Sequence, residues 1–593
     1  MLISNRRRLI IILAALGVIV AIIIGRLVYL QVINNQQIRA EHEELYGREE
    51  ILEPIRGKVV DRNSSVLAIT SYDYRIVATP NQVDKPERVA DILSRILITR
   101  TATLMPLLDN PKMPDGTPLL YIVVAPRVSA ETVQAIQEAI QKAREMDDNL
   151  GQVGIYFEPV PRRHYPSGQL FSHVLGWVTL DMQGATGLER YYEQDLRGEP
   201  VAVRQYPFLF GQWETARPHH GATLVLTLDR TVQYVTEQVL AEALERYIAP
   251  SGSIIVMDPR SYEILAMASS PTFDPNKLYQ SQEDLELMMN PCVSEWFEPG
   301  SIHKVLTMAA AVDSGTVTPE TVYQDAGILE VGGLPLYNWD RGAHGTTDMV
   351  TLLAKSLNVG AATIARWMGQ ETFYSYMRAF GLGDYTGVDL DGEIVGMVKR
   401  PGDDLWTEVD LGTNSFGQGI AVTPLQELVA ITAIANDGVM LQPHLVAEIR
   451  DGDQVRRFQP TVLGQPISKQ TADTVTWMMA QAVAREVPEA IVPGYTIAGK
   501  TGTAQIAQGG IYHPTDVIGS FVGFLPADDP QLIVFVKIDR PQVSPNERWG
   551  SMTAAPTFAK LAQQLVVLLD IPPDSERVKG QVASAQPQRA NNR

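Results

Sequence analysis

The segment FEPGSIHK, residues 297–304, combines residue types that could perform nucleophilic catalysis. Ser301 and Lys304 are three positions apart, so on a helix their side chains share one face. The preceding E-P-G interrupts any earlier helix and would place Ser301 near a helix N-terminus, where the dipole favours developing negative charge. A serine needs a base to become nucleophilic, and a neutral lysine amine can be that base. The alternative, a capping serine beside a surface lysine, is favoured for an isolated S-x-x-K pattern.

A second hydroxyl comes from Ser356-Leu357-Asn358, in the segment AKSLNVG. The hydroxyl of Ser356 could shuttle protons, and the amide of Asn358 could hold a substrate carbonyl. The pattern is weak alone, because S-x-N recurs at 544–546, where a proline-rich turn predicts an ordinary loop.

The third group is Lys500-Thr501-Gly502-Thr503, in IAGKTGTAQIA, which reads as a strand. Gly502 would let a substrate backbone approach closely. The lysine and the threonine hydroxyls could hold a terminal carboxylate, and a backbone N–H here could form an oxyanion hole with that of the S-x-x-K serine. A glycine-containing turn is the ordinary reading of this tetrapeptide by itself. The order S-x-x-K, S-x-N, K-T-G, however, is the combination found in serine β-lactamases and penicillin-binding proteins, so the joint catalytic interpretation is favoured.

The N-terminal segment predicts a membrane anchor for these groups. Three arginines at 6–8 precede an uncharged apolar run from Leu9 to Gly25, and LVYLQV follows Arg26. A span needs about 20 apolar residues. A cleaved signal peptide is the alternative, but no A-x-A-like site follows the run. We expect a cytoplasmic tail at 1–8, a transmembrane anchor at 9–32 and the remainder outside, since an acidic stretch follows from Glu41.

Composition excludes other classes. The net charge of −19 argues against a nucleic-acid partner, whose binding surfaces are basic. A single cysteine, Cys292, allows neither an intramolecular disulfide nor a paired C-x-x-C metal site. We therefore expect no metal and no cofactor.

The chain divides into regions by pattern. Strand and helix patterns alternate over 40–230, and a second unit at 245–572 begins and ends with strands around a helical middle. This order predicts an α+β fold with helices on both faces of a sheet. The tail at 573–593 is polar and predicted to be disordered.

These blocks resemble the class B penicillin-binding proteins, which are peptidoglycan D,D-transpeptidases. RGKVVDRN (56–63) and GLERYYEQDLRG (187–198) are similar to the family's pedestal, or dimerisation, domain, which would be residues 40–230. GSIIVMDPRSYEILAMASSPTFDPN and SFGQGIAVTPLQ resemble its transpeptidase domain, which would be 245–572. The C-terminal part looks more like the division-type branch, with FtsI and SpoVD, than the elongation-type branch. The implied fold is a β-lactamase-like antiparallel sheet with helices on both faces.

The resemblance implies an activity. Ser301 would attack a D-Ala-D-Ala stem peptide with Lys304 as base, Ser356 and Lys500 would assist proton transfer, and Asn358 would bind substrate. Thr501, Gly502 and Thr503 would line the substrate strand, and β-lactams would acylate the serine. The implied partners are a SEDS-type glycan polymerase and divisome proteins. A D,D-carboxypeptidase, a β-lactamase and a non-catalytic sensor or scaffold remain alternatives.

Two residues depart from the family pattern. His303 stands where an apolar or aromatic residue is usual. Position i+2 points away from the face of Ser301, so we expect it to pack rather than to act as a base. Ser64 stands where the pedestal motif usually has glycine, which makes the shape of that turn uncertain.

Overall fold

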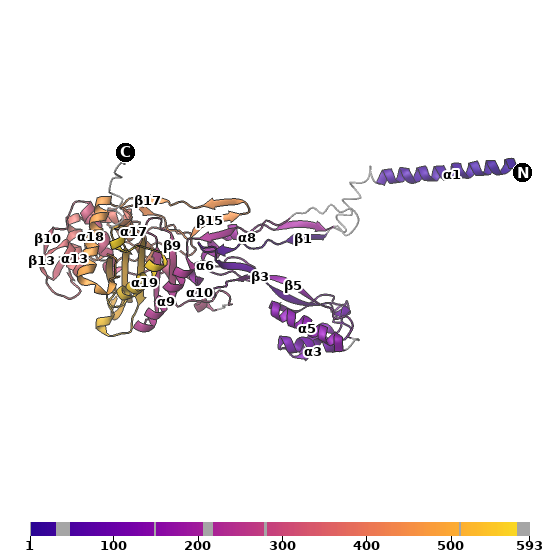
Figure 1. Cartoon of the computed structure of the whole chain (residues 1–593), viewed down its shortest axis with the longest axis horizontal. Coiled ribbons are helices and arrows are strands. Elements are labelled where there is room, and N and C mark those ends of the chain that lie inside the picture. Colours follow the sequence, from indigo (N-terminus) through magenta and orange to yellow (C-terminus); the bar gives the residue numbers. More distant parts are fainter. Residues whose placement is uncertain are drawn as a thin grey trace, which may run out of the picture. The chain divides into compact units, whose positions relative to one another are not determined.

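The computed structural model describes residues 2–30, 48–146, 150–205, 217–277, 281–508 and 511–577. Helix α1 (Leu2–Val28) contains residues 9–28 of the predicted span of 9–32, and residues 31–32 lie outside the described residues (Figure 1). Its stretch Leu9–Val28 has a mean hydropathy of 2.9, and it is the one helix in the described ranges long and apolar enough to cross a membrane. At about 1.5 Å per residue, 20 residues cover the roughly 30 Å of a bilayer core. Most of the predicted acidic stretch, up to residue 47, lies outside the described residues.

A small unit comprises residues up to Ile55 together with Arg197–Gly221. In it β1 (Arg48–Leu52) pairs antiparallel with β6 (Val201–Gln205). All other described residues beyond Ile55 form the second unit, which contains the three motifs.

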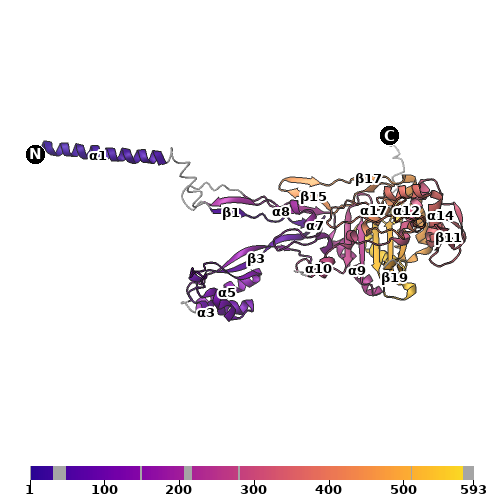
Figure 2. The same cartoon turned by 180° about the vertical axis from the view of Figure 1, so that it is seen from behind.

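The first sheet of the second unit has the order β16-β15-β7-β2-β3-β4, with β5 also paired to β3. Its strands are β2 (Val59–Val60), β3 (Val66–Ala78), β4 (Ile122–Val128), β5 (Ile155–His164), β7 (Thr223–Leu226), β15 (Val446–Asp451) and β16 (Gln454–Arg457). Helices α3 (Pro86–Leu97), α4 (Thr101–Leu108) and α5 (Ala130–Met146) share a core with β3 (Figure 2). Because β15 and β16 come from the middle of the predicted C-terminal domain, this sheet joins both predicted regions.

The two pedestal motifs meet in a buried charge cluster. Arg56 of RGKVVDRN donates to Glu189 of GLERYYEQDLRG at 2.7 Å, and Arg163 donates to the other carboxylate oxygen at 2.7 Å. Burial raises the pKa of Glu189, but the charges of Arg163 and Arg56 outweigh it and the net pKa is lowered. A carboxylate shared by two guanidinium groups therefore holds together segments 133 residues apart.

The turn that follows Arg56 keeps its shape despite the serine. Ser64 adopts a left-handed backbone with φ of 66°, a conformation that favours glycine. Asp61 is buried and accepts the N–H groups of Asn63 at 2.9 Å and Ser65 at 2.7 Å. These bonds fix the turn, so the serine there is accommodated with backbone strain.

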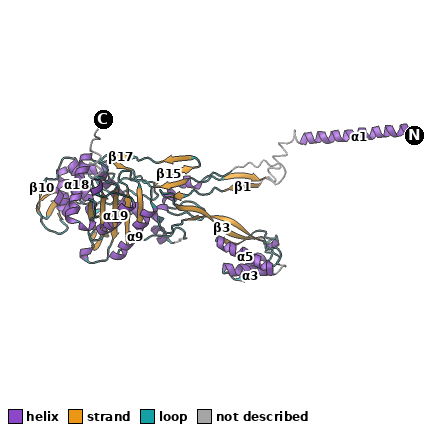
Figure 3. Cartoon of the chain, viewed as in Figure 1, coloured by secondary structure: helices purple, strands orange, loops and turns teal. Residues whose placement is uncertain are grey.

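The second sheet has five strands in the order β18-β19-β20-β8-β9, and they are antiparallel, as the family resemblance implied (Figure 3). The strands are β8 (Ser251–Met257), β9 (Ile264–Ser270), β18 (Ala498–Gln508), β19 (Ile511–Leu525) and β20 (Leu532–Asp539). Every residue of β20 is buried. Its almost continuous apolar run reflects burial on both faces, like a strand in the centre of a layered domain.

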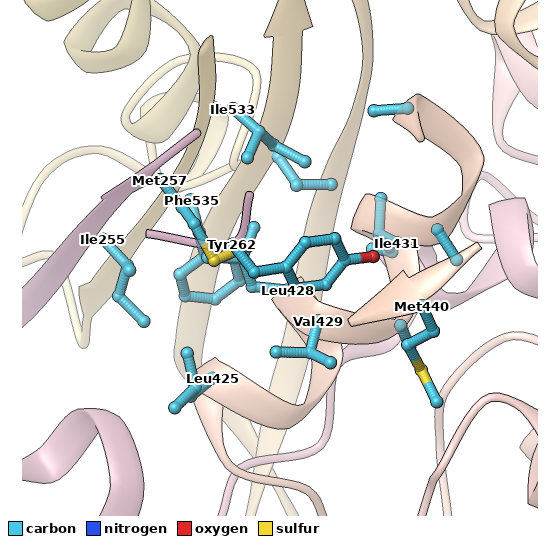
Figure 4. Close-up of a cluster of buried hydrophobic side chains, with 14 of the residues drawn as sticks. Ile255, Met257, Tyr262, Leu425, Leu428, Val429, Ile431, Met440, Ile533 and Phe535 are labelled. Atoms are coloured by element: carbon cyan, nitrogen blue, oxygen red, sulfur yellow. The ribbon is translucent and has the colours of Figure 1, made fainter. Parts of the chain in front are cut away.

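Alternate residues of β8 face different helices. Ile254 and Val256 share a core with α9 (Arg230–Tyr247) and α19 (Ala554–Leu568). Ile255 and Met257 face α17 (Pro424–Ala435) instead. Figure 4 shows this second layer, where the strand side chains lie beside Leu425, Leu428, Val429 and Ile431. The prediction of helices on both faces is confirmed.

The helical middle carries further elements. Two hairpin-like pairs, β10 (Val322–Asp325) with β13 (Gly345–Asp348) and β11 (Ile328–Val331) with β12 (Leu334–Tyr337), interrupt it. The helices are α12 (Lys304–Asp313), α13 (Met349–Lys355), α14 (Asn358–Met368), α15 (Gln370–Ala379), α16 (Glu408–Asn414) and α18 (Lys469–Glu486).

The predicted disorder from residue 573 is wrong for the first few residues. The carboxylate of Asp574 accepts both the N–H and the hydroxyl of Thr496 at 2.7 Å, and Arg577 pairs with Asp574 at 3.1 Å. The polar composition of the tail gave no sign of these specific hydrogen bonds and this ion pair. The rest of the predicted tail, 578–593, lies outside the described residues.

Candidate active site

The nucleophile candidate lies in a short 3₁₀ turn, Gly300–His303, that leads into α12. A 3₁₀ helix has three residues per turn, so side chains at i and i+3 eclipse more closely than in an α-helix. Ser301 is partly exposed, and its Oγ lies 3.0 Å from the Nζ of Lys304. The predicted pair is therefore in hydrogen-bond contact, at the start of the helix.

The S-x-N motif lies between helices, as predicted. Ser356 follows α13 in a left-handed conformation with φ of 54°, and Asn358 begins α14. The Nζ of Lys304 lies 2.6 Å from the carbonyl oxygen of Ser356, 3.2 Å from its Oγ and 2.7 Å from the Oδ1 of Asn358. The strained backbone of Ser356 thus presents both its carbonyl and its hydroxyl to the same amine.

The amide of Asn358 is oriented by a second bond, because its Nδ2 donates to the carbonyl oxygen of Tyr337 at 3.1 Å. Its oxygen faces Lys304. One N–H of the amide is left for a substrate carbonyl, so the sequence prediction for this residue is compatible with a further role in holding the lysine.

The K-T-G lysine completes a chain of polar groups. Lys500 donates to the Oγ of Ser356 at 2.9 Å and to the carbonyl oxygen of Thr501 at 2.9 Å. The hydroxyl of Ser356 therefore lies between two amines, and contacts run from Ser301 through Lys304 and Ser356 to Lys500. The structure thus brings together three segments that are more than 50 residues apart.

Both lysines are buried without a carboxylate. Lys304 is 1% exposed and Lys500 is 3% exposed, and within the described part of the chain neither forms an ion pair. Burial, reinforced by the charge of Lys500, holds the pKa of Lys304 well below its usual range. Burial lowers the pKa of Lys500 to about 7. The site thus favours neutral amines near neutral pH.

The glycine of K-T-G is required by close packing. A Cβ on Gly502 would lie 2.3 Å from the Oγ of Ser520 and 2.9 Å from the Cγ2 of Ile302. Strand β18 is at the edge of its sheet, and the 3₁₀ turn packs against it. Thr503 is partly exposed, and its Oγ1 accepts the N–H of Gly550 at 3.0 Å.

The SFGQG block, which carried only a resemblance in the sequence, supports the nucleophile turn. Gly300, with φ of 57°, donates its N–H to the carbonyl oxygen of Gly417 at 2.9 Å. A Cβ on Gly417 would lie 2.2 Å from the carbonyl oxygen of Gly300. Gly300 and Gly417 must both be small for their backbones to meet. A glycine in each segment is therefore the sequence feature that could have suggested this contact.

His303 points away from the nucleophile, as predicted. It is fully buried, and its Nδ1 lies 3.2 Å from the Oε1 of Glu427, which is also fully buried. Glu427 belongs to α17, so this pair ties the nucleophile turn to the helix that covers the sheet. No local pattern marks Glu427, which is 124 residues away.

An exposed aromatic pair joins the motif segments and was not predicted. Trp339 and Trp549 have ring centroids 5.4 Å apart and are 55% and 38% exposed. The indole N–H of Trp339 donates to the carbonyl oxygen of Lys355, which precedes the S-x-N serine. Trp549 precedes Gly550, the partner of the K-T-G segment.

The chain matches two protein families. Residues 252–563 match the penicillin binding protein transpeptidase domain, and residues 51–206 match the penicillin-binding protein dimerisation domain. Stage V sporulation protein D of Bacillus subtilis is 33% identical, with 97% of this chain and 88% of that protein aligned. The probable peptidoglycan D,D-transpeptidase PenA of Neisseria meningitidis is 29% identical over 96% of this chain and 94% of its own length.

A solved structure has the same fold. Penicillin-binding protein 3 of Mycobacterium tuberculosis, complexed with aztreonam, superposes with a TM-score of 0.68 at 28% identity, covering 88% of this chain and 98% of that one. One family match thus spans more than half of the chain, and a relative aligns with nearly all of it. The chain therefore belongs to the class B penicillin-binding proteins, in which a dimerisation domain precedes a transpeptidase domain.

Proposed function

We propose that this chain crosslinks peptidoglycan as a serine D,D-transpeptidase, with Ser301 as the acylated nucleophile and Lys304 as its base. The observation that carries the proposal is the 3.0 Å contact between Ser301 Oγ and a lysine amine that is buried without a carboxylate. A relative of similar length is named a probable peptidoglycan D,D-transpeptidase.

The contacts of Lys304 suit a neutral amine. Such an amine has two N–H donors and one lone pair. The two shortest contacts, at 2.6 Å and 2.7 Å, are to the carbonyl oxygen of Ser356 and the Oδ1 of Asn358, which only accept. These occupy both donors and leave the lone pair for the hydroxyl of Ser301. As its Oγ bonds to the penultimate carbonyl carbon of a D-Ala-D-Ala terminus, its proton passes to Lys304.

The edge of β18 provides the binding strand. An edge strand has backbone groups without a neighbouring strand, which an extended peptide can pair with. We assign the oxyanion hole to the backbone N–H groups of Ser301 and Thr503. The hydroxyls of Thr501 and Thr503, with Lys500, lie where they can receive the terminal carboxylate.

Proton return uses the hydroxyl between the lysines. Ser356 passes a proton from Lys304 to the leaving D-alanine nitrogen as the peptide bond breaks, and Lys500 holds that hydroxyl in place. An amine of a neighbouring stem peptide then attacks the ester, which releases the serine and forms the crosslink. The ester retains the energy of the broken peptide bond, so the reaction needs no ATP.

The cellular setting is proposed from the N-terminal helix and from the family. We place α1 in the bacterial cell membrane, with residues 1–8 in the cytoplasm and the catalytic domain outside, facing its peptidoglycan substrate. The division-type resemblance favours septal synthesis with a SEDS-type glycan polymerase and divisome proteins. A fluorescent fusion that localises along the lateral wall, rather than at the septum, would contradict the septal role.

Labelled penicillin tests the nucleophile. The purified full chain in detergent should be marked covalently, and Ser301→Ala should lose the label completely. Ser544→Ala, in the second S-x-N copy, is the matched control and should be labelled like the parent protein. Labelling that persists in Ser301→Ala overturns the assignment.

Product analysis tests the acceptor. With a D-Ala-D-Ala donor peptide and an acceptor amine, the crosslinked product should exceed the hydrolysed one. Hydrolysis that is unaffected by the amine would instead identify a D,D-carboxypeptidase.

A further inference from the structure

A second candidate binding site is a cavity of about 220 Å³ outside the three motifs. It is lined by residues of β3, β4 and β5, by residues 177–182 and by the segment after β9, and none of its lining residues belongs to the S-x-x-K, S-x-N or K-T-G segments. The lining residues that carry a charge or an indole N–H group are Asp73, Arg127, Arg162, Arg163, Trp177 and Lys277.

The lining is cationic in a protein whose net charge is −19. It contains the side chains of three arginines and Lys277 but one carboxylate, that of Asp73. Asp73 is shared, because its oxygens lie 3.5 Å from Arg162 Nη1 and 3.9 Å from Arg127 Nε. Lys277 lies 3.9 Å from Asp274, and Arg163 binds Glu189, so the surplus of positive charge rests on Arg127 and Arg162, which share the single carboxylate of Asp73.

Two residues of the lining, Arg163 and Trp177, each carry a buried N–H group that has no acceptor among the described residues. Arg163 is 4% exposed; its Nε binds Glu189 and its Nη1 donates to Gly57 at 2.6 Å, but its Nη2 has no partner. The indole Nε1 of Trp177 is also buried and unpartnered. Buried polar groups without partners are rare in folded proteins and call for a ligand or water.

The walls of the cavity are rigid on one side. Asn276 clamps the backbone of Tyr165 with two bonds of 3.0 Å, which fixes the segment after β9 against β5 and the residue that follows it. Apolar groups of Trp177, Leu180 and Met182 complete the lining. A ligand would thus meet cations and N–H donors beside apolar surface.

We propose that this cavity binds an oxyanion, the carboxylate or phosphate group of a small ligand, independently of the catalytic site. Guanidinium and indole N–H groups donate to such oxygens, and arginine is suited to their planar or tetrahedral geometry. The volume admits the anionic group with a short apolar attachment. Arg163 holds Glu189 as well, so the site is built onto the buried charge cluster.

The test follows the indole signal of Trp177 in the full chain, held in an uncharged detergent with ¹⁵N-labelled tryptophan. Trp177→Phe assigns the signal. Titration with inorganic phosphate, and separately with N-acetyl-D-glutamate, should shift the signal saturably at constant ionic strength set with sodium chloride. The signals of Trp339 and Trp549 should not move. Saturation by one probe only identifies the phosphate or the carboxylate as the preferred group.

Arginine variants distinguish binding at this cavity from a general effect of ionic charge. Arg127→Gln with Arg162→Gln should weaken the apparent Kd at least about tenfold, since charge-assisted hydrogen bonds are lost. Arg75→Gln is the matched control, because Arg75 pairs with Glu158 at 3.7 Å, is exposed and does not line the cavity. The control should bind like the parent protein. No saturable shift with either probe, or equal affinity in the double variant, overturns the proposal.

Discussion

The molecule buries basic side chains in two regions, and the partners of these side chains differ between the two. In the pedestal, Arg56 and Arg163 share the carboxylate of Glu189. In the candidate active site, Lys304 and Lys500 are buried with hydroxyls, carbonyls and an amide as partners. The first arrangement keeps charges paired, and the second lowers lysine pKa values.

The choice of residue follows from this difference. Arginine stays protonated in proteins, so a buried arginine requires an anion and serves structure. Lysine can release its proton, and burial without a carboxylate makes that release favourable. The same physical condition, exclusion of water, therefore produces a fixed link in one region and a base in the other.

The largest expected effect comes from removing a lysine of the candidate active site. Lys304→Met removes the base and should slow penicillin acylation by about 10²- to 10⁴-fold, the range for general base catalysis. Thermal unfolding should show a smaller loss of stability than breaking the Glu189 cluster, because the acceptors Ser356 and Asn358 lose a donor but no paired charge is broken. Acylation is measured with labelled penicillin, and Lys355→Met, an exposed lysine at the end of α13, is the control. A normal rate in Lys304→Met would show that another group is the base.

The next largest effect comes from breaking the buried charge cluster of the pedestal. Glu189→Gln leaves two buried arginines without their carboxylate and should lower the free energy of unfolding by about 3–5 kcal/mol. The acylation rate of the folded fraction should not change. Glu158→Gln, which breaks an exposed pair with Arg75, should cost about 0–1 kcal/mol. A Glu189→Gln protein as stable as the Glu158→Gln control would contradict the structural role of the cluster.

The buried lysine of the K-T-G motif should make the stability depend on pH. The pKa of Lys500 is lowered from 10.5 to about 7, so between these values the unfolded chain binds more protons than the folded one. Stability should therefore rise with pH across this window, by at most about 1.4 kcal/mol per pH unit for one lysine. Denaturant unfolding from pH 7 to 9 measures the slope. Lys500→Met should reduce it, and an identical slope in both proteins would mean that Lys500 is charged in the folded state.

Many residues of the candidate active site could be predicted from sequence because they lie in short motifs. Ser301 and Lys304 are local neighbours, and the S-x-N and K-T-G segments have their own helix and strand signals. Glu427 could not be predicted as the partner of His303, since the pair depends on how α17 packs. The same holds for Trp339 beside Trp549.

The fold was predictable to the same extent. The order of strand patterns around a helical middle indicated a sheet with helices on both faces. The pairing of β15 with β7 had no such signal, because strand partners distant in sequence are chosen by tertiary packing. The hydrogen bonds of Asp574 were missed for a similar reason: a polar composition does not show whether one particular carboxylate meets a partner.

The smallest effect concerns a pedestal residue outside the charge cluster. Ser64 is exposed and left-handed, so Ser64→Gly should relieve backbone strain of about 1–2 kcal/mol, partly offset by the greater freedom of glycine in the unfolded chain. We expect a net gain below about 1 kcal/mol, measured by denaturant unfolding, with acylation unchanged. A loss of stability would indicate that the hydroxyl has a stabilising partner.

The most direct test of the central claim is to locate the acyl group by mass spectrometry. The full chain is quenched in acid during reaction with a D-Ala-D-Ala donor peptide and then digested. Our account predicts a single ester-linked adduct, less the terminal D-alanine, on the peptide that contains Ser301, and its absence from Lys304→Met at the same reaction time. An adduct on any other residue, or an adduct of equal yield in Lys304→Met, would contradict it.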